Sequence, residues 1–453
     1  MIKRTGRRTG NRAWLETLRR YEAPNVTYLD PDGRWPIVWL RARGEWVWDV
    51  EGRRYLDLTA AFGVAMAGYG NPELVRALRG QIRELIHGMG DVHPHVRKIE
   101  LLRELSRITF ERWTQGRRAG LKGRAILACT GFEAVEVALK TACRATGRPW
   151  VAAFEGGYHG LGYGALNVTH RDLFRQPFES QLRRFGRFVP FPAREADVPL
   201  VEACLERLHR RHGLGAVLVE PVQGRGGIRV PPGSFLPRLR AWCDARGVLL
   251  VLDEIFTGFG RTGAWFACEH AGVVPDLICL GKALTGGFPL SACVGRSDLM
   301  EAAWPPSQGE ALHTSTFQGN PLGCCMALAQ IRTLEERGLA ARAARLGGWL
   351  MDRLRLVEPA RGLEYEVRGL GLMVGLEVRH SDGRPATPVV WEALKRMRER
   401  GFLLLPEGAE ASVVAFTPPL TISRAALDRA VAALGDALAG AARQWARQGG
   451  KQA

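Results

Sequence analysis

The chain has 453 residues, a hydrophobic fraction of 46% and a mean hydropathy of -0.10, values that are ordinary for a globular protein. No run reaches the ~18 apolar residues that a membrane span needs, and the basic start, Met1 to Trp14, lacks the apolar stretch of a secretion signal. The composition therefore argues against a membrane protein, and we expect a cytoplasmic chain with one large and one smaller domain.

The net charge of +17 raises nucleic-acid binding as a distant alternative. Only seven of the 63 basic residues are lysines, and the arginines are spread along the whole chain. A basic cluster occurs only at Lys3, Arg4, Arg7 and Arg8. Because a dedicated binder usually shows a basic cluster with interleaved aromatics or a known motif, the pattern favours an arginine-rich composition without nucleic acid as partner. The nine cysteines show no Cys-x-x-Cys spacing and are expected to be reduced thiols.

Apolar runs and helical stretches alternate through the middle of the chain. Strands are predicted near residues 125, 150, 216, 248, 277 and 291, with helices over 132–146 and 234–246 between them. This order predicts an α/β fold with a mostly parallel sheet covered by helices. From about residue 330 the pattern changes to Arg/Ala/Leu-rich helix, then an alternating strand from Tyr365 to Val378, then a terminal helix after Ser423.

Three of the predicted strands run into segments that could bind a ligand. The strand Ala125 to Cys129 leads into Thr130-Gly131-Phe132-Glu133, whose capping-box spacing would leave N–H groups of Gly131 and Phe132 free for a phosphate. The other two lead to Tyr158, whose ring could stack on a flat ligand, and to Glu220. Ligands gather at the carboxyl ends of strands in such sheets. Taken singly, each segment is better explained as a capped helix or a loop than as a binding site.

Lys282 and Asp253 carry the chemical prediction. Lys282 is the only lysine between Lys140 and Lys395, and it follows the apolar run Leu277 to Leu280. Asp253 ends the run Val248 to Leu252, so both groups are expected at one edge of the sheet. A lysine for a Schiff base and a carboxylate for a ring nitrogen suit pyridoxal phosphate. The alternative is a loop lysine beside a strand-end cap.

Three other motifs give weaker indications. Residues 258–263 fit G-x-G-x-x-G, but the acidic residue expected about 20 positions later is missing, so we interpret them as a loop. Gly281-Lys282 is not a phosphate-binding P-loop, because Ala283 follows the lysine. A metal is not expected, since the spacing of four possible ligands is poor evidence for a site: His87, Asp91, His93 and His95.

The segment Asp253 to Gly263, followed by Pro275-Asp276 and Gly281-Lys282-Ala283, resembles the signature of class-III pyridoxal-phosphate aminotransferases. That family includes ornithine, acetylornithine and 4-aminobutyrate aminotransferases. The resemblance extends over nearly the whole chain, from Trp48-Asp49-Val50-Glu51-Gly52 to Pro418-Pro419-Leu420. It implies a fold type I enzyme with a small domain from 1–65 and 330–453 and a large cofactor-binding domain over 66–329.

The resemblance also implies a role for each matching residue. Lys282 matches the Schiff-base lysine and Asp253 the partner of the pyridine nitrogen. Thr316 matches the threonine that reaches the phosphate of a neighbouring subunit, which implies a homodimer with shared active sites. The remaining matches are the phosphate turn Gly131 and Phe132, the stacking Tyr158 with His159 behind it, the substrate-side Glu220, and Ile255 on the other ring face.

Four departures bear on the substrate. The arginines that bind substrate carboxylates in many relatives are replaced by Ala415 and Leu161, and bidentate recognition of that kind is not easily replaced. Phe256 stands where a glutamine is common, and Phe132 where a small hydroxyl residue is common. The replacements at the arginine positions favour amines or ω-amino compounds as donors, with two further candidates for carboxylate binding: Arg225 and Arg229.

We therefore expect a ping-pong transaminase that moves an amino group from an amine, ω-amino or amino acid donor to pyruvate or 2-oxoglutarate. Lys282 would act as nucleophile and then as general base or acid. An aminomutase of the same fold shares Lys282 and Asp253, so it remains an alternative.

Overall fold

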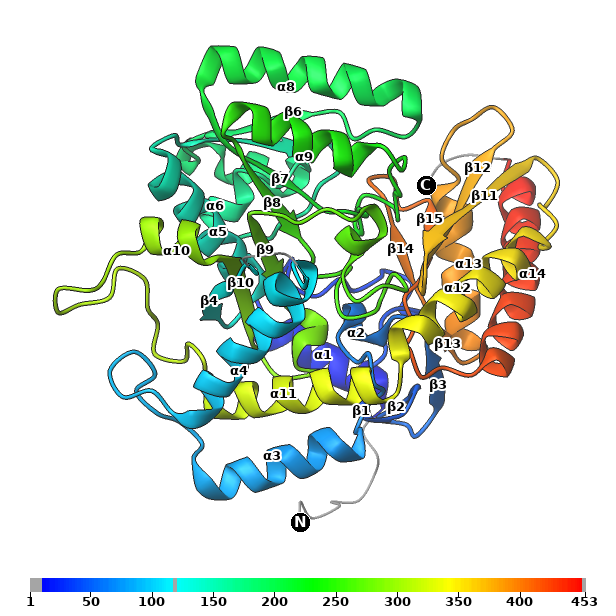
Figure 1. Ribbon diagram of the computed structural model, residues 1–453. Coiled ribbons are helices and arrows are strands. Elements are labelled where there is room, and N and C mark those ends of the chain that lie inside the picture. The colour runs from blue at the N-terminus through cyan, green and yellow to red at the C-terminus, as the bar shows by residue number, and fades with distance from the viewer. Residues whose placement is uncertain (1–9, 117–119, 450–453) are drawn as a thin grey trace.

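The structure is a computed structural model that describes residues 10–116 and 120–449 (Figure 1). A seven-stranded sheet in the order β4-β10-β9-β8-β7-β5-β6 forms the centre of the larger part. All paired strands are parallel except β10, which is antiparallel to β4 and β9. The strand bounds are β4 Gly123–Ala128, β5 Trp150–Phe154, β6 Gly186–Val189, β7 Leu214–Val219, β8 Leu249–Asp253, β9 Leu277–Leu280 and β10 Ser291–Arg296.

The six strands expected from the sequence are all present, and the mixed α/β class is confirmed. The expectation missed β6, a short edge strand whose middle residues are only partly buried. Four residues without a continuous apolar run give little periodic signal.

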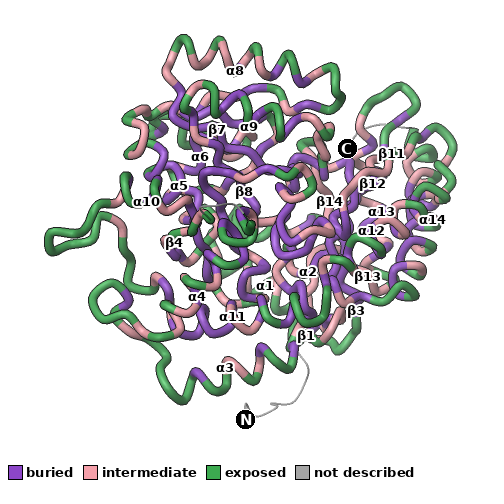
Figure 2. The backbone as a smooth tube through the Cα atoms, in the orientation of Figure 1, coloured by how far each residue is buried: buried purple, intermediate pink, exposed green. Residues whose placement is uncertain are grey.

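The central sheet is buried on both faces, as its continuous apolar strands require. On β7, Ala216 and Leu218 pack with α5 (Gly131–Thr146), whereas Val217 and Val219 face the opposite way. That opposite face belongs to a core shared with α8 (Val198–His212), α9 (Phe235–Arg246) and α11 (Pro321–Glu336). Figure 2 shows the buried strands enclosed by helices whose outer sides are exposed.

The two ends of the chain meet at a small sheet of order β1-β2-β3-β13, in which β3 and β13 pair in parallel. Helix α11 crosses residue 330, so the proposed domain boundary falls within a helix, and the boundaries stay a prediction. The strand bounds are β1 Trp39–Arg43, β2 Trp46–Asp49, β3 Arg54–Asp57 and β13 Phe402–Leu403.

The C-terminal part is an antiparallel sheet of order β11-β12-β15-β14. The single alternating strand expected from Tyr365 to Val378 is wrong: it is a hairpin that turns at Gly371, where φ is +56°. The expected terminal helix is α14, capped by Ser423. The bounds are β11 Leu363–Leu370, β12 Met373–His380, β14 Leu405–Glu407, β15 Val413–Phe416, α12 Leu339–Arg355, α13 Thr387–Glu399 and α14 Arg424–Arg447.

Most of the remaining helices lie at the periphery, whereas α2 (Ala60–Gly63) contacts the turn that carries Lys282. None of the helices in the described ranges is long and apolar enough to cross a membrane. Helix α3 begins at Pro72 after its cap Asn71, and it packs with α4 and α11 along one side of the molecule. The α-helical bounds are α1 Asn11–Tyr21, α2 Ala60–Gly63, α3 Pro72–Glu84, α4 Val96–Ser106, α6 Tyr163–Leu166, α7 Asp172–Arg175 and α10 Ser297–Ala303. The short 3₁₀ and π turns cover 107–111, 176–181, 195–197, 267–271 and 282–284.

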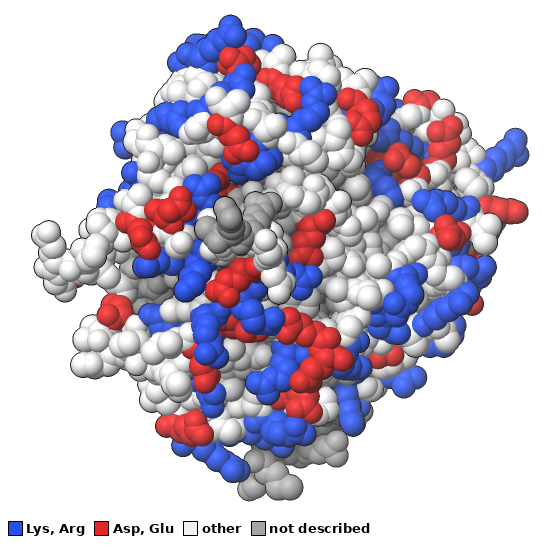
Figure 3. All heavy atoms as spheres, in the orientation of Figure 1, with Lys and Arg blue, Asp and Glu red and all other residues white. Residues whose placement is uncertain are grey.

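Acidic and basic side chains are interspersed over most of the face drawn in Figure 3. Many arginines pair with carboxylates, as Arg34 does with Glu392 at 2.7 Å and Arg107 with Glu335 at 2.7 Å. Such ion pairs neutralise part of the positive charge that the arginines of the described residues carry.

Candidate active site

A cavity of about 410 Å³ opens at the carboxyl ends of β5, β7, β8 and β9. Parallel strands bring their ends to one edge, so residues far apart in the chain converge there. All the residues predicted to bind the cofactor line this cavity, except Thr316. Four further residues line it: Gly160, Leu161, Arg225 and Phe256.

Two hydrogen bonds hold the Asp253 carboxylate in place. It ends β8, is 4% exposed, and its Oδ2 lies 2.8 Å from Nδ1 of His159. Its Oδ1 accepts a hydrogen bond from the Ile255 backbone N–H at 3.1 Å. His159 is itself buried, and its Nε2 has no hydrogen-bond partner among the described residues. The contact with His159 thus fixes the Asp253 carboxylate where it lines the cavity.

Lys282 follows β9 and reaches the same cavity from the neighbouring strand. Asp253 pairs with Cys279 across β8 and β9, which places Lys282 and Asp253 at adjacent strand ends. The Lys282 backbone has a φ of +41°, in the left-handed region that costs free energy for any residue with a side chain. Burial lowers the pKa of Lys282, and the negative charges of Asp253 and Glu220, which raise that pKa, offset only part of the effect. A lowered pKa leaves more of the amine neutral and nucleophilic.

The N-terminus of α5 faces the cavity through Gly131 and Phe132. The Glu133 carboxylate accepts hydrogen bonds from the backbone N–H groups of Cys129 and Thr130, each at 2.8 Å, so the expected capping arrangement is present. The first-turn N–H groups of a helix have no acceptor within it and are suited to a phosphate. The Phe132 side chain lies against Gly160 and Gly162, which leaves the turn accessible through its backbone.

Tyr158 and Arg225 form one wall of the cavity. The guanidinium carbon of Arg225 lies 4.9 Å from the centre of the Tyr158 ring, and Phe174 contacts the same ring edge-on at 5.7 Å. The Arg225 Nε is buried and has no partner within the described part of the chain. Of the two arginines suggested for carboxylate binding, the structure brings Arg225 to the cavity, whereas Arg229 is exposed outside it.

Glu220 follows β7 and is engaged at both carboxylate oxygens. It accepts hydrogen bonds from the backbone N–H of Tyr158 and of Gly224, each at 3.0 Å. Burial raises the pKa of Glu220, and the nearby Asp253 adds to that effect. Glu220 therefore holds two loops of the cavity together as well as lining it.

Glu407 is a charged neighbour of the cavity that the sequence did not indicate. It ends β14, and the next N–H, from Gly408, donates to the Arg225 carbonyl oxygen at 3.2 Å. Burial raises the pKa of Glu407 to about 7, against the positive charges of Arg225 and Lys282. Only the pairing of β14 with β15 brings Glu407 here, and no local motif marks it.

The position of the usual carboxylate-binding arginine lies in an apolar cluster behind Phe256, which lines the cavity. Ala415, which occupies that position, is 4% exposed and packs in a cluster with Val222, Ile228 and Met373. Phe256 packs against the same cluster. An arginine at position 415 would be buried among these groups, so the structure accounts for the alanine by its surroundings.

Thr316 and the possible metal ligands lie outside the cavity. Thr316 is exposed in the segment before α11. His95 caps α4 through Nδ1, and its Nε2 lies 2.7 Å from the Gly319 carbonyl oxygen. Asp91 accepts a hydrogen bond from Thr314 at 2.7 Å. These contacts give His95 and Asp91 structural roles, and no group of three metal-ligating side chains occurs in residues 10–116 and 120–449.

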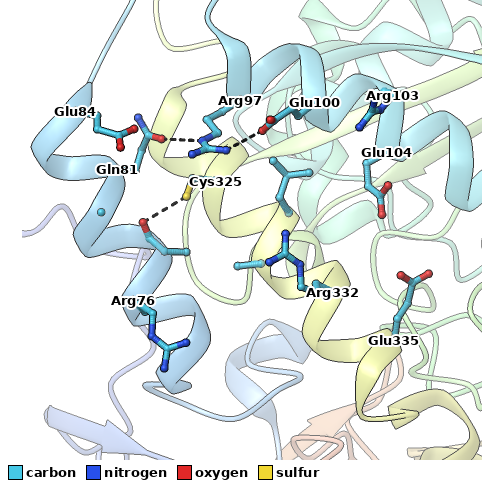
Figure 4. A pocket seen from close by; sticks show the side chains of 14 residues that line it. Arg76, Gln81, Glu84, Arg97, Glu100, Arg103, Glu104, Cys325, Arg332 and Glu335 are labelled. Carbon is cyan, nitrogen blue, oxygen red and sulfur yellow. Dashed lines mark hydrogen bonds and ion pairs between the residues drawn. The ribbon is translucent and has the colours of Figure 1, made fainter.

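A larger hollow of about 560 Å³ lies between α3, α4 and α11 (Figure 4). Its charges are partly neutralised within the wall: Arg97 pairs with Glu100 at 2.9 Å and donates to Gln81 at 3.2 Å. Its Cys325 donates to the Ala77 carbonyl oxygen at 3.4 Å, and burial raises the pKa of this thiol. Because the thiolate is the reactive form, we place the chemistry in the cavity around Lys282 and not here.

Comparisons with known proteins identify the class. The family model for class-III aminotransferases matches residues 28–438, so this chain belongs to the class-III aminotransferase family. An acetylornithine aminotransferase from Methanopyrus kandleri is 37% identical over 91% of this chain and 96% of its own length. A 5-aminovalerate aminotransferase from Pseudomonas aeruginosa is 35% identical over 88% and 93%.

Solved structures agree with this assignment. An amine transaminase from an uncultivated Pseudomonas species, solved with pyridoxal phosphate bound, has a TM-score of 0.83 and 29% identity over 93% of this chain and 99% of its own. An (S)-enantioselective omega-transaminase from Thermomicrobium roseum has a TM-score of 0.85 and 28% identity over 96% and 99%. The fold is that of the type I pyridoxal-phosphate enzymes, and pyridoxal phosphate is the cofactor.

The residues around the cavity fit this cofactor. An amine, a carboxylate and the N-terminus of α5 open to one space, as an aldehyde, a ring nitrogen and a phosphate require. Gly131 lies close to Ile255, because a Cβ at this position would be 3.2 Å from two Ile255 carbons and would require that side chain to shift slightly.

Proposed function

We propose that this chain is a transaminase for amine or ω-amino donors that uses Lys282 as its Schiff-base residue. As a class-III aminotransferase it moves an amino group from an amino donor to a 2-oxo acid. The observation that carries the proposal is the meeting of the Lys282 amine and the fixed Asp253 carboxylate in one cavity. Pyruvate and 2-oxoglutarate are the acceptors we propose.

The binding roles follow from the contacts of the side chains. Asp253, oriented by His159, would pair with the ring nitrogen of the cofactor. The N–H groups of Gly131 and Phe132 would hold the phosphate, while Tyr158 and Ile255 would cover the two ring faces. Glu220 would keep the loop of Tyr158 and the loop of Gly224 at a fixed separation.

The reaction requires a group that moves a proton, and Lys282 supplies it. Bound pyridoxal phosphate supplies an aldehyde that joins to amines and a ring that accepts electrons when the substrate carbon loses a proton. The Lys282 ε-amine would act first as nucleophile, and it would then take the proton from the substrate carbon and deliver it to the C4′ carbon of the cofactor. Two such half-reactions in series, one per substrate, form a ping-pong cycle.

The proposed substrate preference rests on the residues at the two positions where relatives carry a carboxylate-binding arginine. Ala415 and Leu161 offer no cation to a substrate carboxylate, and Arg225 is the guanidinium that lines the cavity. We therefore propose amines and ω-amino compounds as donors, with Arg225 binding the carboxylate of the acceptor.

The test is a donor and acceptor panel with the purified protein. Turnover of amines or ω-amino acids, with KM for the 2-oxo acid raised about tenfold or more in Arg225→Ala, is the expected result. Comparable turnover of an α-amino acid, with no change in Arg225→Ala, would contradict the proposed specificity.

An aminomutase of the same fold is the second candidate, because Ala415 and Leu161 remove the expected carboxylate-binding groups. An aminomutase needs no external acceptor, whereas a transaminase without an acceptor stops after one half-reaction per active site. Product formation in large excess over enzyme with donor alone would favour the aminomutase.

A second copy of the chain is the partner we propose. The surface beside Thr316 exposes large apolar side chains, including Val92 at 64%, Leu312 at 70% and Phe317 at 61%. The segments that carry them are joined by a hydrogen bond from Asn320 to the Ile86 carbonyl oxygen at 3.1 Å. An apolar surface next to the predicted phosphate-reaching threonine supports a homodimer with shared sites.

A further inference from the structure

Phe256 lies directly beside the Lys282 amine. Lys282 Nζ is 4.1 Å from the centre of the Phe256 ring, within the range of a cation–π contact. The family resemblance places a glutamine at this position, so the aromatic face is a feature of this chain. The amine therefore meets a π surface where many relatives present an amide.

Gly63 and Gly224 pack closely against opposite edges of the Phe256 ring. A Cβ on Gly63 would lie 2.5 Å from ring atom Cε2, and a Cβ on Gly224 would lie 2.4 Å from Cδ1. Both distances are far below van der Waals contact, so neither position tolerates a side chain while the ring stays in place. Gly63 also has a φ of +78°, which favours glycine independently.

The backbone of Lys282 is constrained as well. Its φ of +41° is an unfavourable conformation that the surrounding structure imposes. This conformation sets the direction in which the Lys282 side chain leaves the backbone. With the Lys282 backbone and the Phe256 ring both fixed, the amine has a defined position over the ring face.

We infer that Phe256 is a positioning residue that orients the free ε-amine of Lys282 and stabilises its protonated form. This inference rests on the proposed role of Lys282. The electron-rich ring face attracts an ammonium and has little attraction for a neutral amine. Burial and the charge of Arg225 favour the neutral amine, whereas the carboxylates of Asp253, Glu220 and Glu407 favour the ammonium. Phe256 adds to the effect of the carboxylates and so adjusts how readily Lys282 accepts and releases a proton.

The direct test measures the pH dependence of Lys282 acylation in the full-length protein freed of cofactor. Only neutral amines react, so the rate against pH reports the Lys282 pKa, and peptide mass spectrometry separates the seven lysines. Exposed Lys122 serves as the internal reference. In Phe256→Leu the Lys282 pKa should fall by about half to one unit while Lys122 is unchanged.

Ring fluorination separates the electrostatic effect from packing. A ring-trifluorinated phenylalanine at position 256 keeps the shape of the side chain and weakens the negative ring face, so it should lower the Lys282 pKa in the same direction. It also decides the matter if Phe256→Leu does not fold. Phe132→Leu, which removes another ring from the same cavity, should leave the Lys282 pKa unchanged.

An unchanged Lys282 pKa in the fluorinated protein would overturn the inference. A change of equal size in Phe132→Leu would also overturn it, because the effect would then belong to the cavity in general. The proposed function is tested separately in the wild type, by borohydride reduction with the cofactor present. Cofactor attached to Lys282 with no pKa effect of Phe256 would leave the proposed function standing without this inference.

Discussion

Asp253 shows how a single side chain is prepared for its role. Both of its oxygens are hydrogen-bonded. Oδ2 lies 2.8 Å from Nδ1 of His159, and Oδ1 accepts from the Ile255 backbone N–H at 3.1 Å. Such preorganised groups stabilise charge without the cost of reorganisation during the reaction. The electrostatic contribution that we propose for Asp253 thus depends on a carboxylate whose position is already fixed.

Replacing this carboxylate should remove catalysis and keep the fold. Asp253→Asn is expected to lower kcat about 100-fold or more, since a neutral amide cannot hold a proton on the ring nitrogen. Steady-state kinetics with the best donor measures the loss. The matched control is Asp276→Asn, which removes a buried carboxylate paired with Arg240 and Arg296 away from the cavity. A loss of kcat in the control equal to that of Asp253→Asn would contradict the assigned role.

Glu407 predicts a pH dependence of acceptor binding. With a pKa of about 7 it is neutral at lower pH and anionic at higher pH, where it competes with an acceptor carboxylate for Arg225. The value of kcat/KM for a 2-oxo acid should fall several-fold as the pH rises through 7, and Glu407→Gln should remove that fall. An identical pH profile in the two proteins would exclude this role.

Residue-level prediction from sequence succeeded in locating side chains at strand ends. Asp253 ends the buried strand β8 and Lys282 comes just after Gly281, which follows the buried strand β9. Because parallel strands end at one edge, their meeting was predictable. The position of Glu407 was not, because it depends on how β14 packs against the loop of Arg225. The sequence also could not show which of Arg225 and Arg229 lines the cavity, because that depends on the direction in which the loop places each side chain.

At the scale of elements, the loop 258–263 joins the large sheet to the C-terminal part. Its Arg261 is fully buried and donates to the Leu372 and Pro418 carbonyl oxygens at 2.8 and 2.7 Å. The sequence predicted a loop here and rejected a dinucleotide site, but it gave no sign of this buried arginine. A buried cation is found only through the carbonyl groups that surround it.

Arg261→Met should destabilise the protein by about 3 kcal/mol, because two buried carbonyl oxygens lose their donor. Urea unfolding followed by circular dichroism measures the free energy of unfolding. Arg12→Met, at an arginine side chain that is 93% exposed, should change the stability by less than about 0.5 kcal/mol. Equal stability of the two variants would show that the Arg261 contacts contribute nothing.

The boundaries of elements were less predictable than their existence. The hairpin of β11 and β12 was expected as one strand, because alternation of apolar residues continues through a turn that depends on Gly371. Edge strand β6 was missed because packing of the sheet, and not local sequence, defines it. The helices α5 and α9 were found within one residue of their starts, since a cap or a turn residue precedes each apolar stretch.

At the scale of the whole molecule, the exposed apolar surface around Phe317 predicts self-association. Val92→Asp combined with Phe317→Asp should convert a dimer into monomers in analytical ultracentrifugation, because burying like charges across a two-fold contact is unfavourable. The matched control is Leu356→Asp, at a leucine that is 69% exposed after α12. A wild-type protein that sediments as a monomer at all concentrations would contradict the proposed dimer.

The central claim is that Lys282 forms the covalent bond to pyridoxal phosphate. The most direct measurement is borohydride reduction of the purified protein with excess cofactor, followed by peptide mass spectrometry. We predict that the reduced cofactor is attached to Lys282 and that Lys282→Ala carries no label at any of the other six lysines. An unmodified Lys282 in the wild-type protein, or a label on another lysine, would contradict the account.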